Sequence, residues 1–201
     1  MLEKEEKEWA SIEDFATLFQ YFWYRDFPMD AKMAVGAGRV DWTIHIGIVV
    51  RNIADLMGFV TRFESGKRKD AVMRNTEQDV IALEWEWEGS RGNEIKKLKE
   101  HRLWSYDEDR QRKLQYAVFI TYTTTEDIDK VYEDVSHKWG DASWPLLLVL
   151  IEVKESGEFF SGREFKHIWM SLFDKGKPTQ FRSAPALPWE VSKTRWSREL
   201  K

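Results

Sequence analysis

The sequence predicts an α/β fold in which a mixed β-sheet is flanked by helices. Two segments with helical spacing come first, three short β-rich segments follow between residues 59 and 88, and strands alternate with helices from 79 to 153. Short turns join antiparallel strands, whereas helical crossovers join parallel ones. We therefore expect a sheet that is antiparallel in its first part and parallel in its second.

The two helices expected first have separate signals. Residues 11–24 keep apolar side chains at helical spacing, and Ser11 with Asp14 resembles a capping box. A second helix should begin near Asp41, carry an apolar stripe, and end at Gly58. Both helices are amphipathic and should therefore cover a sheet.

The chain is expected to form one globular unit with two parts. Residues 1–40 would be an N-terminal helical extension packed on an α/β domain of residues 41–201. Residues 1–14 hold six acidic and two basic side chains, which is the whole net charge of −4. The rest of the chain is therefore neutral in total, although local basic patches remain compatible with a polyanionic partner.

The β region follows in order. Residues 59–65 and 69–75 should form a hairpin around Gly66, and 79–88 alternates in the manner of a third strand. Asn93 can cap a helix over the next residues, "EIKKLKEHR".

The second half continues the alternation. After a charged connection, 116–123 should be a strand, 125–140 a helix ending at Gly140, and 145–153 a strand buried on both faces. Residues 158–173 should form a hairpin or a short helix before a basic tail punctuated by prolines.

Composition excludes several classes of protein. The chain has 201 residues, 33% charged and 14% aromatic side chains, and no cysteine, which excludes disulfides and thiolate nucleophiles. The longest apolar run, 145–151, is too short to cross a bilayer, and no secretory signal is visible, so a cytoplasmic protein without a membrane partner is expected. The four histidines lack metal-ligand spacing, and His101, although near the acidic strand, is expected to be a surface imidazole.

The stretch "DVIALEWEWEG" places Glu84, Glu86 and Glu88 on one side of a strand and Trp85 and Trp87 on the other. One interpretation is a solvated acidic face with the indoles packed inward. Against it, glutamate is depleted in strands, and like charges two residues apart repel one another unless a cation lies between them.

The other interpretation is a metal site. Mg²⁺ takes carboxylates together with water and phosphate oxygens, and divalent ions stabilise the charge that develops when a phosphodiester is cleaved. Glu84 and Glu86 share a face, and Asp70 would lie on the neighbouring strand if 69–75 pairs with 79–88.

This order of elements, with Asp70 on the second strand and Glu84-x-Glu86 on the third, resembles the PD-(D/E)xK superfamily of restriction-endonuclease-like nucleases over about residues 42–123. The resemblance implies Mg²⁺ or Mn²⁺ as cofactor, held by Asp70 and Glu84. Glu86 stands where the family usually has lysine and would be a third ligand or would orient the water. Lys96 or Lys97, on the following helix, would contact the phosphate.

A rival match lies further along the chain. "IEVK" gives Glu152-x-Lys154 with Asp141 upstream, but no hairpin precedes its strand and no clear helix follows. The alternative is that Glu152 and Lys154 close the strand at the surface.

Basic residues surround the proposed site in sequence, as phosphate contacts would. The candidates for binding nucleic acid are Lys67, Arg68, Lys69, Arg91, Lys99 and Arg102. The alternative is that each basic group simply forms part of a solvated helix or loop surface. The 11 tryptophans either fill the core or, in loops, stack on bases or on a protein partner.

The sequence thus leads to two hypotheses. The first is a divalent-metal-dependent nuclease acting on nucleic acid, with DNA favoured over RNA; the resemblance also implies a homodimer as one possible assembly. The second is a catalytically inactive α/β interaction domain that binds a protein partner or nucleic acid through a Trp-rich surface.

Overall fold

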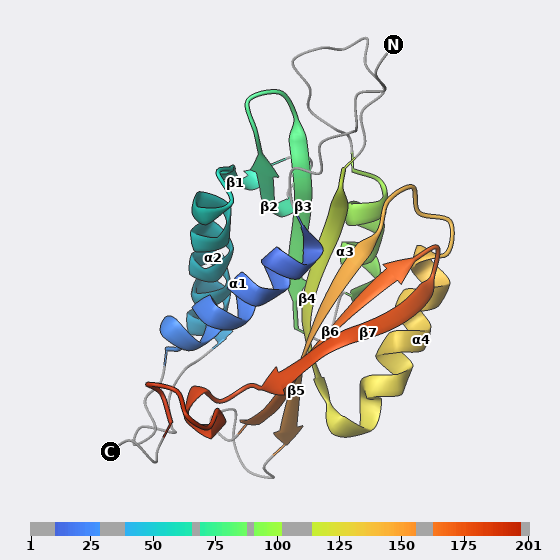
Figure 1. Cartoon of the computed structure of the whole chain (residues 1–201). Helices are drawn as coiled ribbons and strands as arrows, with labels where there is room; N and C mark the ends of the chain where they lie inside the picture. Colours follow the sequence, from blue (N-terminus) through green and yellow to red (C-terminus); the bar gives the residue numbers. More distant parts are fainter. Residues whose placement is uncertain are drawn as a thin grey trace, which may run out of the picture.

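A computed structural model describes residues 11–28, 39–65, 69–87, 91–101, 114–155 and 163–197. Within them the chain is an α/β protein with a seven-stranded mixed sheet and four α-helices (Figure 1). The helices are α1 (Ile12–Arg25), α2 (Arg39–Leu56), α3 (Arg91–Lys99) and α4 (Ile128–Trp139). The strands are β1 (Val60–Ser65), β2 (Lys69–Arg74), β3 (Asp79–Glu86), β4 (Tyr116–Thr124), β5 (Leu146–Glu155), β6 (Arg163–Asp174) and β7 (Lys177–Pro185).

The strands lie in the sheet in the order in which they occur in the chain. β1, β2 and β3 form an antiparallel meander, β3, β4 and β5 are parallel, and β5, β6 and β7 are antiparallel again. The parallel pairs are joined through α3 and α4, as crossover connections require. The predicted mixed sheet, antiparallel first and parallel second, is confirmed.

Helices cover both faces of the sheet (Figure 1). α1 and α2 pack on one face, where their buried side chains share a core with Ile81, Leu83 and Ile120. α3 and α4 pack on the other face against Ala82 and Phe119. Alternate residues of one strand therefore enter different cores, which follows from the two-residue period of a strand.

Strand β5, in the interior of the sheet, is buried on both faces. Leu147, Val149 and Ile151 belong to the core under α1 and α2, and Leu148 and Leu150 to the core under α3 and α4. This matches the continuous apolar run in the sequence and explains why β5 shows no alternation.

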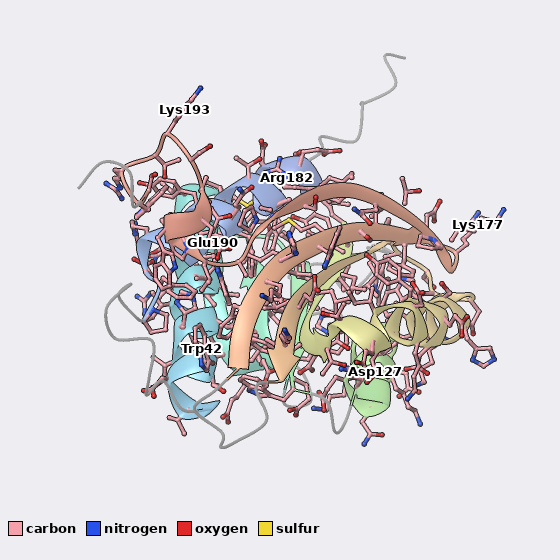
Figure 2. All side chains as sticks on the ribbon, turned by 90° about the horizontal axis from the view of Figure 1, so that it is seen from below. Trp42, Asp127, Lys177, Arg182, Glu190 and Lys193 are labelled. Carbon is pink, nitrogen blue, oxygen red and sulfur yellow. The ribbon has the colours of Figure 1, made fainter. Side chains whose placement is uncertain are left out.

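Helix α1 joins the beginning of the described chain to its end. Its first turn is capped as predicted, with Ser11 Oγ accepting a hydrogen bond from Asp14 N at 3.3 Å. Its last turn is tied to the end of β7 and the residue that follows: Tyr24 Oη donates to Pro185 O at 2.6 Å, and Trp23 Nε1 to Ala186 O at 2.7 Å. Arg182 of β7, labelled in Figure 2, donates to Thr17 Oγ1 at 2.9 Å.

Two expectations about elements were wrong. α3 begins at Arg91, so Asn93 lies inside the helix and does not cap it. The segment 158–173, expected to be a hairpin or a short helix, contributes its described residues to the single strand β6, which forms a hairpin with β7 from the proline-punctuated tail. β7 is an edge strand, so Pro178 and Pro185 remove no hydrogen bond that a further strand needs.

Several predicted segments lie outside the described residues. They are the Gly66 turn with Lys67 and Arg68, the end of the acidic strand with Glu88, the connection 105–113 and Arg102. None of the helices that the structure describes is both long enough and apolar enough to span a bilayer.

Candidate functional site

Asp70 and Glu84 lie side by side on β2 and β3. The antiparallel register pairs Ala71 with Leu83, so the next pair along the ladder is Asp70 with Glu84, on the same face. Asp70 N donates to Glu84 Oε2 at 3.4 Å, and Trp85 N donates to Asp70 Oδ2 at 2.7 Å. The strand end thus holds both carboxyl groups in place through the backbone.

Helix α3 adds two charged side chains to this pair. Lys97 Nζ lies 3.9 Å from Glu84 Oε2 and also donates to Glu94 Oε2. Glu94 and Lys97 are three residues apart and therefore share a helix face. The carboxylate cluster, defined here as Asp70, Glu84, Glu94 and Lys97, contains three carboxyl groups and one ammonium group.

The cluster has unusual electrostatics. Glu84 is fully buried, and this burial, together with the charge of Asp70 and the nearby Glu94, raises its pKa from 4.5 to about 9. Burial also raises the pKa of Asp70, partly offset by hydrogen bonds from Trp85 N and from the Glu84 side chain. Near neutral pH the Glu84 carboxyl group is therefore protonated and can donate to Asp70.

One oxygen of Glu84 stands out. Oε1 is buried and accepts no hydrogen bond from any described group. A buried carboxyl oxygen without a donor is costly, because the desolvation of the group is not compensated. The Lys97 ammonium group offsets part of this cost at Oε2 only. When Glu84 is ionised, the cluster is therefore short of positive charge on the side of Oε1, and either a proton or a cation can supply it.

The remaining predicted catalytic residues are not in the cluster. Glu86 is half-buried, and its Oε1 accepts from Trp87 N at 2.7 Å. Lys96 points away from the carboxyl groups, with its side chain 69% exposed and 3.8 Å from Glu100. Among the described residues no three His, Cys, Asp or Glu side chains are arranged to hold a metal ion. Of the three residues predicted as metal ligands, only Asp70 and Glu84 therefore lie together.

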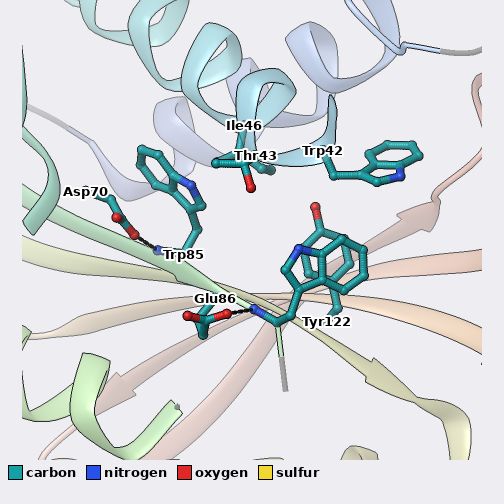
Figure 3. A pocket seen from close by; sticks show the side chains of 8 residues that line it. Trp42, Thr43, Ile46, Asp70, Trp85, Glu86 and Tyr122 are labelled. Atoms are coloured by element: carbon teal, nitrogen blue, oxygen red, sulfur yellow. Dashed lines mark hydrogen bonds between the residues drawn. The ribbon is translucent and has the colours of Figure 1, made fainter. Parts of the chain in front are cut away.

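A pocket of about 180 Å³ adjoins the cluster on the α2 side of the sheet (Figure 3). Asp70 belongs both to the cluster and to the lining of the pocket. The lining consists of Trp42, Thr43 and Ile46 of α2, Asp70, Trp85, Glu86 and Trp87 at the ends of β2 and β3, and Tyr122 of β4. Trp87 lies over Tyr122 with ring centroids 4.0 Å apart and an angle of 8° between the ring planes.

The described basic residues that were predicted to bind nucleic acid lie in different environments. Lys69 is buried. Arg91 donates to Thr121 Oγ1 at 3.2 Å and to Tyr122 O at 2.5 Å, and so fixes α3 to β4. Lys99 donates to Lys138 O at 3.1 Å and to Asp141, and so joins α3 to α4. These contacts give each of the two long side chains a structural role, and phosphate binding stays a prediction.

The rival motif forms no second cluster. Glu152 is buried and accepts from Thr125 Oγ1 at 2.7 Å and from Trp169 Nε1 at 2.9 Å. Asp141 is fully exposed, bonded to Lys99, and precedes the start of β5, whereas Glu152 lies near its other end. Glu152 is six residues further along the strand than Leu146, the start of β5, which is roughly 20 Å. The expectation that Glu152 merely closes the strand at the surface is also wrong.

His101 differs from the expectation. It is not a surface imidazole but is buried, with Nε2 3.1 Å from Asp79 Oδ2, and Asp79 in turn accepts from Arg74 Nε at 2.7 Å. This hydrogen-bonded group fixes the end of α3 to the start of β3. It lies at the opposite end of β3 from Glu84 and Glu86.

Comparison with protein-family models, with curated proteins and with solved structures finds no match to this chain. The structure itself defines the protein as an α/β protein with a seven-stranded mixed sheet. Its candidate site is a buried carboxylate cluster beside an aromatic pocket. Sequence reasoning missed Glu94, although its spacing from Lys97 in "EIKK" already places the two on one helix face.

Proposed function

We propose that the protein is a divalent-metal-dependent nuclease that hydrolyses phosphodiester bonds in nucleic acid, with DNA favoured. Asp70 and Glu84 would hold Mg²⁺ or Mn²⁺, and Lys97 would contact the phosphate. A bound dication would stabilise the charge that develops on the phosphate oxygens and favour ionisation of water.

The buried Oε1 atom of Glu84 carries this proposal. A carboxyl group whose pKa is raised to about 9 beside two other carboxyl groups is stabilised strongly by a cation. Mg²⁺ commonly takes one or two carboxylates and completes its shell with water and phosphate oxygens, so the pair Asp70 and Glu84 suffices as protein ligands. Glu94 would then keep Lys97 oriented toward the pair.

The order of elements also supports the proposal. α2, the β1–β2–β3 meander, α3 and β4 follow one another as in the restriction-endonuclease-like core that the sequence resembles. The two acids lie on its second and third strands, and a lysine from the following helix approaches them. In such a core Lys97 would replace the lysine that is absent at Glu86.

Hydrolysis is the direct test. Fluorescently labelled single-stranded DNA, double-stranded DNA and RNA would be incubated with the wild type and Mg²⁺ or Mn²⁺. Glu84→Gln and Lys97→Met should each reduce cleavage about a hundredfold or more, since both remove groups that act on the developing charge. Lys96→Met is the matched control, because Lys96 lies one residue away and outside the cluster.

A thermal-shift titration provides a second measurement. Saturating Mg²⁺ should raise the melting temperature of the wild type, by linkage to a site present only in the folded state, and should leave Glu84→Gln unchanged. The proposal fails if all three substrates stay intact and neither metal ion shifts the wild type. It fails equally if Glu84→Gln cleaves as fast as the wild type.

One observation favours the second candidate, a non-catalytic interaction domain. Val40, Ile44 and Ile48 follow one another at intervals of four residues on α2 and are 68%, 55% and 45% exposed. Such a row suits a helical or extended partner. Retained partner binding by Glu84→Gln, without hydrolysis by the wild type, would support this candidate.

A further inference from the structure

We infer that the aromatic pocket beside the carboxylate cluster binds one unpaired nucleobase, so that the substrate is single-stranded nucleic acid or a strand with an extruded base. The inference rests on the proposed function for its choice of ligand and specifies its substrate. The aromatic pocket is defined by its eight lining residues, Trp42, Thr43, Ile46, Asp70, Trp85, Glu86, Trp87 and Tyr122.

The size of the pocket restricts its occupant. A dry cavity of about 150 Å³ in another protein admits a benzene ring, whereas sites for drug-sized ligands begin at about 300 Å³. A volume of about 180 Å³ therefore suits one planar ring system. The sugar and phosphate of a nucleotide would remain outside.

The walls of the pocket favour a flat ligand. Trp87 and Tyr122 are nearly parallel and together present one flat wall, with Tyr122 almost fully buried beneath the half-buried Trp87. In Figure 3 the Trp85 indole stands at the other side of the pocket, and Thr43, Ile46 and Trp42 approach from α2 above. A base inserted between the indoles would exchange water for stacking, which is worth about 1–3 kcal/mol for each base.

The edge of the pocket favours a base that carries an amino group. Among its eight described lining residues, two are carboxylates, Asp70 and Glu86, and none is Lys, Arg or His. Carboxylate oxygens accept hydrogen bonds from exocyclic amino groups, as they do from cytosine N4. Adenine, cytosine and guanine carry such groups, whereas thymine and uracil do not.

The position of Asp70 links the pocket to the cluster. Asp70 is one of the residues that line the pocket, and its carboxyl group also hydrogen-bonds with the Glu84 side chain. A base in the pocket would therefore place its own phosphate near the end of β2 and β3, where Asp70 joins the pocket to the cluster. In a duplex the base is paired and stacked, so it reaches such a pocket only after it is unstacked.

Binding without cleavage tests the inference separately from the proposed nuclease activity. Fluorescein-labelled dA12, dC12 and dT12, and a 12-base-pair duplex, would be titrated with full-length protein in EDTA and followed by anisotropy. We expect the single strands to bind more tightly than the duplex, and dA12 and dC12 more tightly than dT12. Trp85→Leu should weaken binding of dA12 about 5- to 150-fold, the equivalent of one lost stacking contact.

Two further variants separate stacking from folding. Trp85→Phe keeps an aromatic ring and should restore most of the affinity that Trp85→Leu loses. Trp196→Leu is the matched control, since Trp196 is also half-buried but packs on Tyr21 and Tyr24, outside the pocket. It should bind dA12 as the wild type does.

Three results would overturn the inference. They are equal affinity for duplex and single strands, unchanged binding of dA12 by Trp85→Leu, and full competition by tetramethylammonium, which would identify an organic-cation site made of aromatic faces and carboxylates. Binding of dA12 that depends on Trp85, without hydrolysis in Mg²⁺, would retain the base pocket and refute the nuclease. Hydrolysis that survives Trp85→Leu with unchanged KM would retain the nuclease and refute the base pocket.

Discussion

Replacing Glu84 with glutamine should stabilise the protein at alkaline pH in the absence of metal ions. The folded state raises the pKa of Glu84 from 4.5 to about 9, so between these values the folded protein holds a proton that the unfolded chain releases. The free energy of unfolding therefore falls as pH rises through this window, by about 1.36 kcal/mol for each pH unit. Between pH 5 and pH 8 the loss approaches about 4 kcal/mol.

Glutamine removes this loss because it resembles the protonated carboxyl group and does not titrate. The amide can donate to Asp70 as the protonated Glu84 does. For a domain of this size about 4 kcal/mol corresponds to a difference on the order of 10 °C in melting temperature. We expect the two proteins to melt at similar temperatures near pH 5, and the variant to melt higher at pH 8.

Thermal unfolding followed by circular dichroism, with EDTA present, measures this difference at half-unit steps from pH 5 to pH 9. Urea unfolding at pH 5 and pH 8 converts it to free energy. Parallel pH profiles for the two proteins would refute the electrostatic account of the cluster, since every other titrating group is common to both.

Three further outcomes are expected. Glu94→Gln should lower the pKa of Glu84, because it removes one of the neighbouring charges that raise it, and the pH profile of stability should then fall less steeply between pH 7 and pH 9. In urea unfolding, Gly176→Ala should lose more stability than Gly58→Ala. Both glycines have φ near +75°, a conformation that costs alanine about 1–2 kcal/mol, but only at Gly176 would the new Cβ lie 2.6 Å from a backbone oxygen. Glu152→Leu should lower the free energy of unfolding by about 1–3 kcal/mol at pH 7 and by less below pH 4. Burial would raise the pKa of Glu152, but hydrogen bonds outweigh it and lower the pKa, so the stabilising contribution of Glu152 is present above pH 4.5 and is lost on protonation. Equal losses of stability at both pH values would contradict this.

The order of elements could be predicted because each has a local signal. The apolar run of β5, the stripe of α4 and the alternation that begins at Glu84 depend on residue spacing within one segment. The strand pairing was also predictable, because short turns join antiparallel neighbours and helical crossovers join parallel ones.

The β6–β7 hairpin was missed because its signals conflict. Prolines at both ends of β7 argue against a strand, and they are tolerated only because β7 is at an edge, a property of the assembled sheet. The turn itself, Lys175 and Gly176, has positive φ at both residues, which is the geometry of a type I′ turn. The glycine in this two-residue turn was the sequence signal from which the β6–β7 hairpin could have been predicted.

The candidate site was predictable only in part. Strand alternation places Asp70 and Glu84 on one face once β2 pairs with β3. The burial of Glu84, which makes its carboxyl group unusual, depends on α3 covering that face, and no local pattern reports which helix covers which strand end. Glu94 joins the cluster for the same reason.

The hydrogen bonds from Trp23 and Tyr24 to Ala186 and Pro185 span 163 and 161 residues of sequence. During synthesis on the ribosome, α1 emerges well before these two acceptors are translated. Until then the aromatic face of α1, including Phe19, lacks part of its final cover. The nascent protein thus exposes an apolar helix face while the residues between α1 and β7 are translated, and exposed apolar surface of this kind is prone to aggregation and is protected by chaperones.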